Sequence, residues 1–542
     1  MIRRRAAGGS ATSRWAYGVT VGLVLALSGP AVPGPAAAQA AGETVRLSGA
    51  GGALSVEGDL LGYDGSFFRI ETPQGLLVVD AFAVTCEGAC PDPGIARITV
   101  SGDAGATSRL LPALLRAYAE PRGLTVKEAR GRVVLSGEAG AALEIGLRGT
   151  GTEEGFADLL TGEADATLAR RPVRTLEAAL ARDAGLGDMR APARARALVP
   201  DALAVVVASG NPVRSLTLPQ LAALFAGALT DWSDLPGGGS GPVRLHLPAE
   251  ASAAAQGFED AVMERAGLPL ALEGVVRHDD PEDLSRAVAA DPGAIGVTWR
   301  DASGTARAVL LGGGCAPPVG PDPFGTESGD YPLAVPLTLY LPALPLPEPA
   351  RDFAAWLLSP EARGAAEAAE AVQPRPAPRP FARDIARISA GIGAARGESG
   401  LAALQSAVTT LEGLSRLPET FRFEDGSARL DATGESAARS LAARLREGEF
   451  DGTRLLFAGF SDATGPADER LSRLRAALVR DHVAELAGGA PGVRLETAGL
   501  GAALPVACPD TVWGRHANRR VELWVEGGKV PAEGSQPDRA AE

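Results

Sequence analysis

Histidine is scarce in this chain of 542 residues, and the familiar sequence signatures of enzymes are missing. The four histidines are His246, His278, His482 and His516, and none stands in an HExxH pair or at metal-ligand spacing from a cysteine or an acid. The chain also has no Gly-x-Ser-x-Gly nucleophile elbow and no P-loop. We therefore expect no enzyme activity, no metal and no cofactor.

Long apolar runs and clustered positive charge are also missing. Residues 1–40 combine four arginines, a short apolar stretch and the small-residue site Ala38-Gln39-Ala40, which is the pattern of a cleaved signal peptide. The apolar run within it is too short to span a bilayer, and no later segment is long enough. Removing four arginines and no acid takes the net charge from −14 to −18, which disfavours nucleic acid and anionic lipid as partners.

Aromatic residues make up only 5% of the chain, and there are four cysteines. Because aromatics are few, the cores must be built from Ala, Leu and Val. Cysteines of an exported protein are expected to be oxidised. Cys86 and Cys90 in CEGAC are close enough to close a small loop, which we favour over a metal site because no histidine is near. Cys315 and Cys508 then either form a disulfide with each other or have no partner.

The pattern along the chain predicts several domains, as the length requires. Alternating apolar runs and turns such as Asp64-Gly65 predict a small antiparallel β-unit first. Strand-like and helical runs then alternate, which predicts parallel sheets in two lobes. A proline-rich QPRPAPRP segment predicts a stiff, extended spacer. The predicted division is a signal peptide at 1–40, a β-domain at 41–93, a two-lobed domain at 94–372, the spacer and a helix at 373–417, a C-terminal domain at 418–527 and a disordered tail at 528–542.

Four motifs in a fixed order mark the C-terminal region: FRFEDGSARLD, FAGFSDATG, DERLSRLRA and WGRHANRRVELWV. With these motifs, residues 418–527 resemble the OmpA-like peptidoglycan-binding domain, which is also found in Pal and MotB. The resemblance implies a βαβαββ sandwich. It further implies that Asp462 and Arg475 clamp the diaminopimelate of the stem peptide, and that Asn518 and Arg519 line the same side.

The chemistry of that ligand agrees with these residue types. Diaminopimelate brings an amine and a carboxylate on one carbon, so a complementary pocket needs one anionic acceptor and one planar, cationic donor. Asp462 and Arg475 supply this combination. The alternative is an ordinary surface ion pair between them, worth about 0 to 1 kcal/mol.

The two-lobed domain contains ITVSGDAGATSRLLPALLRAYAE, LRGTGTEEGFADLLTGEADATLARRPV and GAIGVTW, and these segments resemble phosphate-binding periplasmic proteins of the PstS type. SGDAGATS and GTGTEEG are glycine-rich loops that open helices, which directs backbone N–H groups at an anion. Simple turn chemistry is the alternative use of these glycines. The resemblance nominates as anion-binding residues Thr107, Ser108, Thr150, Thr152, Asp165 and Ser252.

The third arm of that site departs from the family pattern. Such proteins supply an arginine followed by Ser-Gly-Thr, whereas this chain has LHLPAEASAAAQGF, in which Ser252 remains and no arginine precedes it. We therefore expect an anion in this cleft to meet backbone dipoles and to lack a buried guanidinium. A domain that has lost its ligand and serves as a spacer or partner-docking unit is the alternative.

Together these features predict a multi-domain α/β and α+β protein of the periplasm, attached to peptidoglycan and associated with the outer membrane. Its expected function is to bind a phosphate-like anion while the C-terminal domain holds peptidoglycan without a covalent bond. The alternative is a structural envelope protein without a small ligand.

Overall fold

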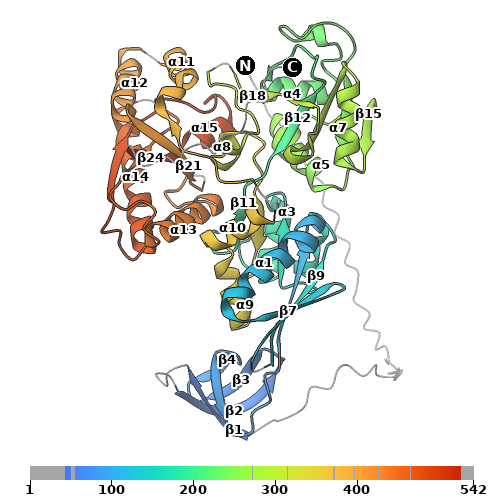
Figure 1. The fold of residues 1–542 in the computed structure, drawn as a ribbon, viewed down its shortest axis with the longest axis vertical. Helices are drawn as coiled ribbons and strands as arrows, with labels where there is room; N and C mark the ends of the chain where they lie inside the picture. Colours follow the sequence, from blue (N-terminus) through green and yellow to red (C-terminus); the bar gives the residue numbers. More distant parts are fainter. Residues whose placement is uncertain are drawn as a thin grey trace, which may run out of the picture.

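The computed structural model describes residues 43–49, 55–138, 140–271, 273–313, 315–369, 373–395, 397–424, 426–463 and 465–526. The signal peptide predicted at 1–40 and the tail predicted at 528–542 lie outside these residues. Figure 1 shows an N-terminal sheet at one end of the molecule, a first lobe next to it, and then a second lobe and a C-terminal region side by side at the other end.

The N-terminal sheet is the antiparallel β-unit that the turn pattern predicts. Asp64 accepts hydrogen bonds from the backbone N–H groups of Ser66 and Phe67, which closes the tight turn between two strands. Cys86 and Cys90 are bonded to each other within the unit. The strand order is β4-β3-β2-β1-β5, with β1 Glu43–Gly49, β2 Ser55–Tyr63, β3 Phe67–Thr72, β4 Gly75–Asp80 and β5 Val84–Glu87.

The first lobe is a seven-stranded sheet with helices packed against it. Its strand order is β11-β19-β10-β6-β9-β8-β7, with β6 Ala96–Gly102, β7 Thr125–Ala129, β8 Arg132–Gly137, β9 Gly140–Arg148, β10 Ala166–Ala169, β11 Ala195–Val199 and β19 Leu337–Tyr340. Its helices are α1 Leu111–Ala119, α2 Thr152–Thr161, α3 Thr175–Asp183, α9 Glu348–Trp356 and α10 Pro360–Ala368.

The second lobe repeats this arrangement around a five-stranded sheet. The strand order is β15-β14-β16-β12-β17, with β12 Leu203–Val207, β14 Arg244–Pro248, β15 Val275–His278, β16 Ala294–Trp299 and β17 Arg307–Ala308. A separate pair is formed by β13 Ser215–Leu216 and β18 Leu310–Leu311. The helices are α4 Leu218–Phe225, α5 Ala253–Phe258, α6 Glu264–Ala266, α7 Pro281–Ala290 and α8 Pro323–Glu327.

Both lobes have mixed sheets, which corrects the prediction of parallel ones. Strands β9, β6 and β10 are parallel, as are β15, β14 and β16, but the remaining neighbours in these two sheets are antiparallel. The connection from β7 to β8 is a tight turn through Gly131, which has a φ of 74°, and such a turn can join only antiparallel strands. Helices connect the parallel strands, as the alternation of strand-like and helical runs in the sequence predicts.

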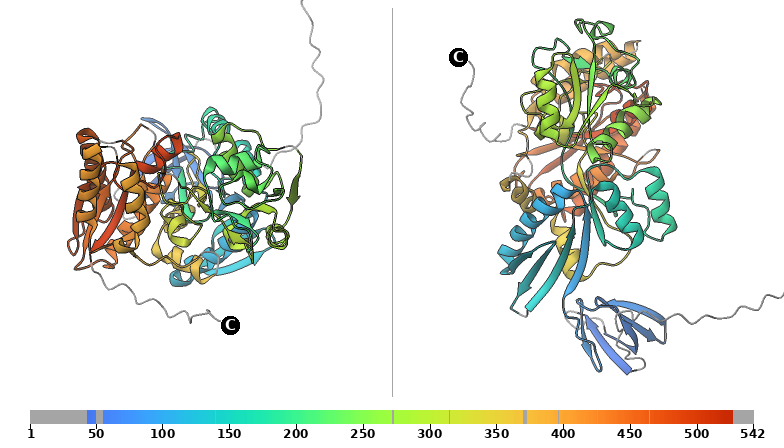
Figure 2. Two further views of the ribbon diagram at one scale, coloured as in Figure 1. Left: turned by 90° about the horizontal axis from the view of Figure 1, so that it is seen from above. Right: turned by 90° about the vertical axis from the view of Figure 1, so that its right-hand side faces the viewer.

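The C-terminal region is a five-stranded sheet with helices on both faces (Figure 2). Apolar side chains on one face pack against α13 and α14, and those on the other face pack against α12. The strand order is β20-β21-β24-β22-β23, with β20 Arg379–Pro380, β21 Leu414–Arg422, β22 Arg454–Gly459, β23 Arg494–Gly499 and β24 Arg520–Glu526. The helices are α11 Ile385–Ala394, α12 Gly397–Leu411, α13 Ala432–Arg446, α14 Pro466–Leu486 and α15 Val512–Asn518.

Two details of this region differ from the sequence pattern. A short helix, α15, lies between the last two strands, where the predicted βαβαββ order has none. Thr511 caps this helix by accepting a hydrogen bond from the backbone N–H of Gly514. The helical pattern that runs through ALQSAVTTLEGLSRL also stops early. Gly413 adopts a φ of 78°, which ends the helix, so the residues after it begin β21.

The proline-rich segment lies against the C-terminal sheet and is not a free spacer. Arg379 and Pro380 pair with β21 as an edge strand, which is where proline is tolerated in a sheet. Arg375 makes an ion pair with the buried Glu419 of β21. The segment is extended, as its prolines predict, but its contacts fix it in place.

A buried cluster of charges joins the second lobe to the C-terminal sheet. Asp330, which follows α8, lies 2.6 Å from Arg416 of β21, and both side chains are almost fully buried. Arg416 is also 3.4 Å from Glu522 of β24. Burial opposes ionisation of Asp330, but Arg416, Arg387 and Arg520 together outweigh it and keep the pKa of Asp330 below its ordinary value. The junction is therefore held by paired charges, each of which needs its partner.

A disulfide crosses the same junction. Cys315 and Cys508 are bonded, at a sequence separation of 193. We expect an unreduced proteolytic digest to contain one cross-linked pair of peptides carrying these two cysteines, and reduction to separate it. Mass spectrometry would show this directly. Recovery of both peptides singly alkylated from unreduced protein would contradict the bond.

Candidate functional site

The turn between β22 and α14 positions the predicted aspartate. A side chain at Gly459, the last residue of β22, would come within 2.0 Å of the carbonyl oxygen of Ser472, so glycine allows α14 to approach the strand. After it, Phe460 donates its backbone N–H to the carbonyl of Arg520, and Ser461 donates to that of Gly501, each at 2.8 Å. These bonds fix the backbone that carries Asp462.

Asp462 pairs with Arg519, and not with Arg475, in this structure. The Oδ2 of Asp462 lies 3.1 Å from the Nη1 of Arg519, and both side chains are about one-fifth exposed. Arg475 is 7% exposed and lies over the ring of Phe423, 5.3 Å from its centroid. Its Nε and Nη1 are buried and have no hydrogen-bond partner. A buried guanidinium with two unsatisfied donors costs free energy unless a ligand accepts from it.

The charges around Arg475 suit an anionic ligand group. Burial lowers the pKa of Arg475, and the neighbouring Arg519 lowers it further, while Asp462 and Asp468 oppose both effects only in part. Arg475 and Arg519 thus lie near Asp462, whose carboxylate is partly exposed. This arrangement can accept a carboxylate at Arg475 and an ammonium at Asp462.

Asn518 supports the neighbouring loop from inside. Its Oδ1 accepts hydrogen bonds from the backbone N–H groups of Val506 and Ala507, at 3.0 and 3.2 Å, and its Nδ2 donates to the carbonyl of Ala507 at 2.7 Å. The side chain is 3% exposed. Asn518 is placed next to Arg519 in the chain, but its amide is engaged in holding this loop.

Between the two lobes lies a guanidinium that the sequence pattern did not lead us to expect. Arg170 follows β10, and its Nε lies 3.3 Å from Asp103 in the first glycine-rich loop. It also pairs with Asp201, in the connection between the lobes, and lies over the ring of Trp299, 4.9 Å from its centroid. Burial lowers the pKa of Arg170, but Asp201 and Asp103 outweigh it, so the pKa stands above its ordinary value. The positive charge is thus already balanced by two carboxylates.

Further contacts from Arg171 and Arg174 bridge the lobes. Arg174 binds Asp260 of the second lobe through two nitrogens, at 2.9 and 3.0 Å. The Nε of Arg171 donates to Gln256 of α5 at 2.8 Å, and Gln256 in turn donates to Glu153 of α2 at 2.5 Å. These bonds join the two lobes to each other.

The six nominated anion-binding residues do not all lie at one end of the sheet, and the hydroxyls of two of them already donate to the backbone. The hydroxyls of Thr107 and Ser108 donate to backbone carbonyls of their own loop, Thr150 contacts Ser101, and Thr152 accepts from the N–H of Arg170. Ser252 caps α5. Asp165 precedes β10 and binds the N–H of Thr99, so it lies at the amino end of that strand, whereas both loops follow the carboxyl ends of β6 and β9.

Arg170, Arg171 and Arg174 lie in one arginine-rich run of the sequence, LARRPVR. That run is the signal that would have located them, because three arginines directly after a strand lie at the edge of the sheet where the glycine-rich loops also end.

Within the described residues there is no group of three or more His, Cys, Asp or Glu side chains that could hold a metal ion. None of the helices in that part of the chain is long and apolar enough to cross a membrane.

A family model described as a PBP superfamily domain matches residues 89–361, half of the chain. Protein SphX of Synechococcus elongatus is 28% identical over 207 residues, 36% of this chain and 58% of SphX. The "Probable lipoprotein YiaD" of Escherichia coli is 35% identical over 109 residues, 20% of this chain and 48% of YiaD. The chain thus spans about half the length of the curated relatives that it matches.

Solved structures of similar fold include an ABC-type phosphate transport receptor from Vibrio cholerae, 20% identical with a TM-score of 0.40, and PstS from Borrelia burgdorferi, 12% identical with a TM-score of 0.38. Each match covers 51% of this chain, together with 100% of the Vibrio cholerae structure and 97% of the Borrelia burgdorferi structure.

Proposed function

The chain belongs to the PBP superfamily, and we propose that it is an envelope protein that holds this binding-protein fold on peptidoglycan, in the periplasm and next to the outer membrane. Proteins of this superfamily are typically binding proteins and not enzymes. The partial match to YiaD, an OmpA-family lipoprotein, supports an OmpA-like region in the chain.

One observation carries the proposal: Arg475 is buried with two unsatisfied donors beside the ion pair of Asp462 and Arg519. A ligand carboxylate would satisfy Arg475, and an ammonium on the same carbon would meet Asp462. Diaminopimelate in the stem peptide presents this pair of groups, and the polymer repeats it, so modest single-site affinity is multiplied by avidity.

Co-sedimentation tests this function. The chain should sediment with purified peptidoglycan that contains diaminopimelate, and free diaminopimelate at millimolar concentration should release it. It should sediment much less with peptidoglycan that carries lysine at the same position, because lysine lacks the second carboxylate. Equal sedimentation with both polymers would contradict the proposed ligand.

For the two-lobed part we propose a structural or docking role, in preference to the binding of a phosphate-like anion. The support is the set of bonds between the lobes and the pairing of Arg170 with Asp103 and Asp201. An anion would have to replace two carboxylates that already neutralise this guanidinium. Glu153 and Glu154 in the first turn of α2 add further negative charge beside the second loop.

We expect phosphate and sulfate to leave the thermal unfolding of the chain unchanged. A ligand at a hundred times its dissociation constant would stabilise the folded state by about 2.7 kcal/mol, which differential scanning calorimetry resolves easily. Sodium chloride of equal ionic strength is the control. A rise in the unfolding temperature with phosphate alone would restore anion binding as the function of the cleft.

A further inference from the structure

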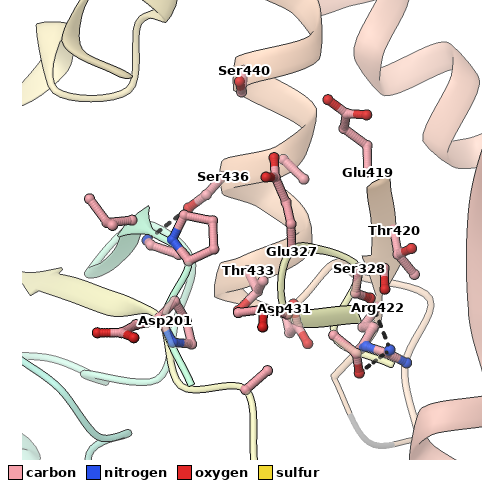
Figure 3. A pocket seen from close by; sticks show the side chains of 18 of the residues that line it. Asp201, Glu327, Ser328, Glu419, Thr420, Arg422, Asp431, Thr433, Ser436 and Ser440 are labelled. Carbon is pink, nitrogen blue, oxygen red and sulfur yellow. Dashed lines mark hydrogen bonds between the residues drawn. The ribbon is translucent and has the colours of Figure 1, made fainter. Parts of the chain in front are cut away.

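A cavity of about 300 Å³ lies where the first lobe, the end of α8 and the C-terminal region meet. Its walls come from the connection between β11 and β12, from residues 326–329, and from β21 and α13. Figure 3 shows the carboxylates of Glu327 and Glu419 beside α13, which carries Ser436 and Ser440. The volume is at the lower end of the range for small-molecule sites.

Three residues that line the cavity have a buried polar atom without a hydrogen-bond partner: Tyr331, through its hydroxyl, Glu419 and Thr326. Glu419 is 5% exposed. One of its carboxylate oxygens accepts hydrogen bonds from Arg375 and Arg444, whereas the other, Oε2, has no hydrogen-bond partner. Thr326 is 4% exposed, and its Oγ1 is also unsatisfied. Unsatisfied buried oxygens are uncommon in folded proteins because each costs about 1 to 3 kcal/mol. A molecule in the cavity that donates hydrogen bonds would satisfy Glu419 Oε2 and Thr326 Oγ1.

The charges of the wall favour a neutral molecule. The lining has equal numbers of carboxylates and guanidiniums: Asp201, Glu327, Glu419 and Asp431 against Arg265, Arg363, Arg375 and Arg422. A charged ligand would bring an uncompensated charge into this partly enclosed space. The wall also offers hydroxyl groups on Thr433, Ser436 and Ser440, and the indole of Trp513 as an apolar surface.

We propose that this cavity binds a small, neutral, polyhydroxylated molecule of monosaccharide size. Hydroxyl groups of the ligand donate to Glu419 Oε2 and to Thr326, and a sugar ring has the apolar faces that suit an indole. The site is separate from the one around Arg475 and does not rest on the proposed attachment to peptidoglycan.

Saturation-transfer NMR on the full chain tests this inference, with glucose, N-acetylglucosamine and glycerol as probes. We expect at least one of the two sugars to receive saturation at millimolar concentration. Ser440→Leu, which places a larger apolar side chain in the wall of the cavity, should weaken that signal by roughly fivefold or more, a loss of about 1 kcal/mol in binding.

Two control variants separate the outcomes. Ser406→Leu, on the exposed face of α12, should keep the wild-type signal, and so should Arg475→Ala. Circular dichroism would show that each variant is folded. Absence of saturation for both sugars would overturn the inference and indicate a cavity that holds only water. A signal that survives Ser440→Leu, or that Arg475→Ala removes, would overturn it as well, because the sugar would then bind elsewhere.

Discussion

Arg475→Ala should remove most of the co-sedimentation of the chain with peptidoglycan. The guanidinium has two buried donors with no partner in the protein, so a bound carboxylate would gain charged hydrogen bonds worth about 1.5 to 3 kcal/mol each. Loss of one such bond lowers the affinity by roughly tenfold to a hundredfold at each site. The measurement is the fraction of protein that pellets over a range of peptidoglycan concentrations.

Two further variants make this test specific. Asp462→Asn changes only the charge of a partly exposed side chain and should also weaken pelleting strongly, since the ligand ammonium loses its anionic partner. Arg473→Ala, on the same helix but with a largely exposed side chain paired to Glu469, should pellet as the wild type does. If both Arg475→Ala and Asp462→Asn pelleted normally, the site would be wrongly assigned.

Asp330→Ala should lower the free energy of unfolding by about 3 to 5 kcal/mol, the cost of leaving a buried charge without its partner. The guanidinium of Arg416 would remain buried with one carboxylate fewer beside it. Because the pKa of Asp330 is lowered in the folded protein, this stabilisation is complete at neutral pH and is lost only as the pH falls below the ordinary aspartate range. Urea unfolding followed by tryptophan fluorescence would measure it.

Asp283→Ala is the matched control for that experiment. Asp283 pairs with Arg286 on α7, and both side chains are more than half exposed. Such pairs contribute about 0 to 1 kcal/mol. Equal effects of the two substitutions would mean that the buried cluster does not stabilise the junction.

The turn that carries Asp462 and the helix that carries Arg475 were predictable because their motifs are neighbours in sequence, whereas the clamp that these two residues would form stays a prediction. The pairing of Asp462 with Arg519 was not predictable from spacing, since 57 residues separate them. It depends on the register of β22 with β24, in which Gly459 lies opposite Val521. Strand pairing between distant segments is set by the whole sheet and leaves no local signal.

The interior of the cleft was harder to predict for a similar reason. The pattern of strands and helices predicted two lobes, and the structure has a separate sheet in each. The pattern could not show that Arg170 would meet Asp103, because that contact requires β10 to pair with β6 so that Leu168 lies opposite Gly102. A sequence motif predicts which residue types are present, whereas the register of the strands decides which charged side chains form ion pairs.

The disulfide between Cys315 and Cys508 has a mechanical consequence. Under the proposed attachment to peptidoglycan, a force applied at the turn that carries Asp462 would pass through α14 and the sheet, and at the junction the disulfide would share the load with the buried ion pairs. The two lobes would then move together with the peptidoglycan network as it stretches, and their orientation relative to it would stay fixed.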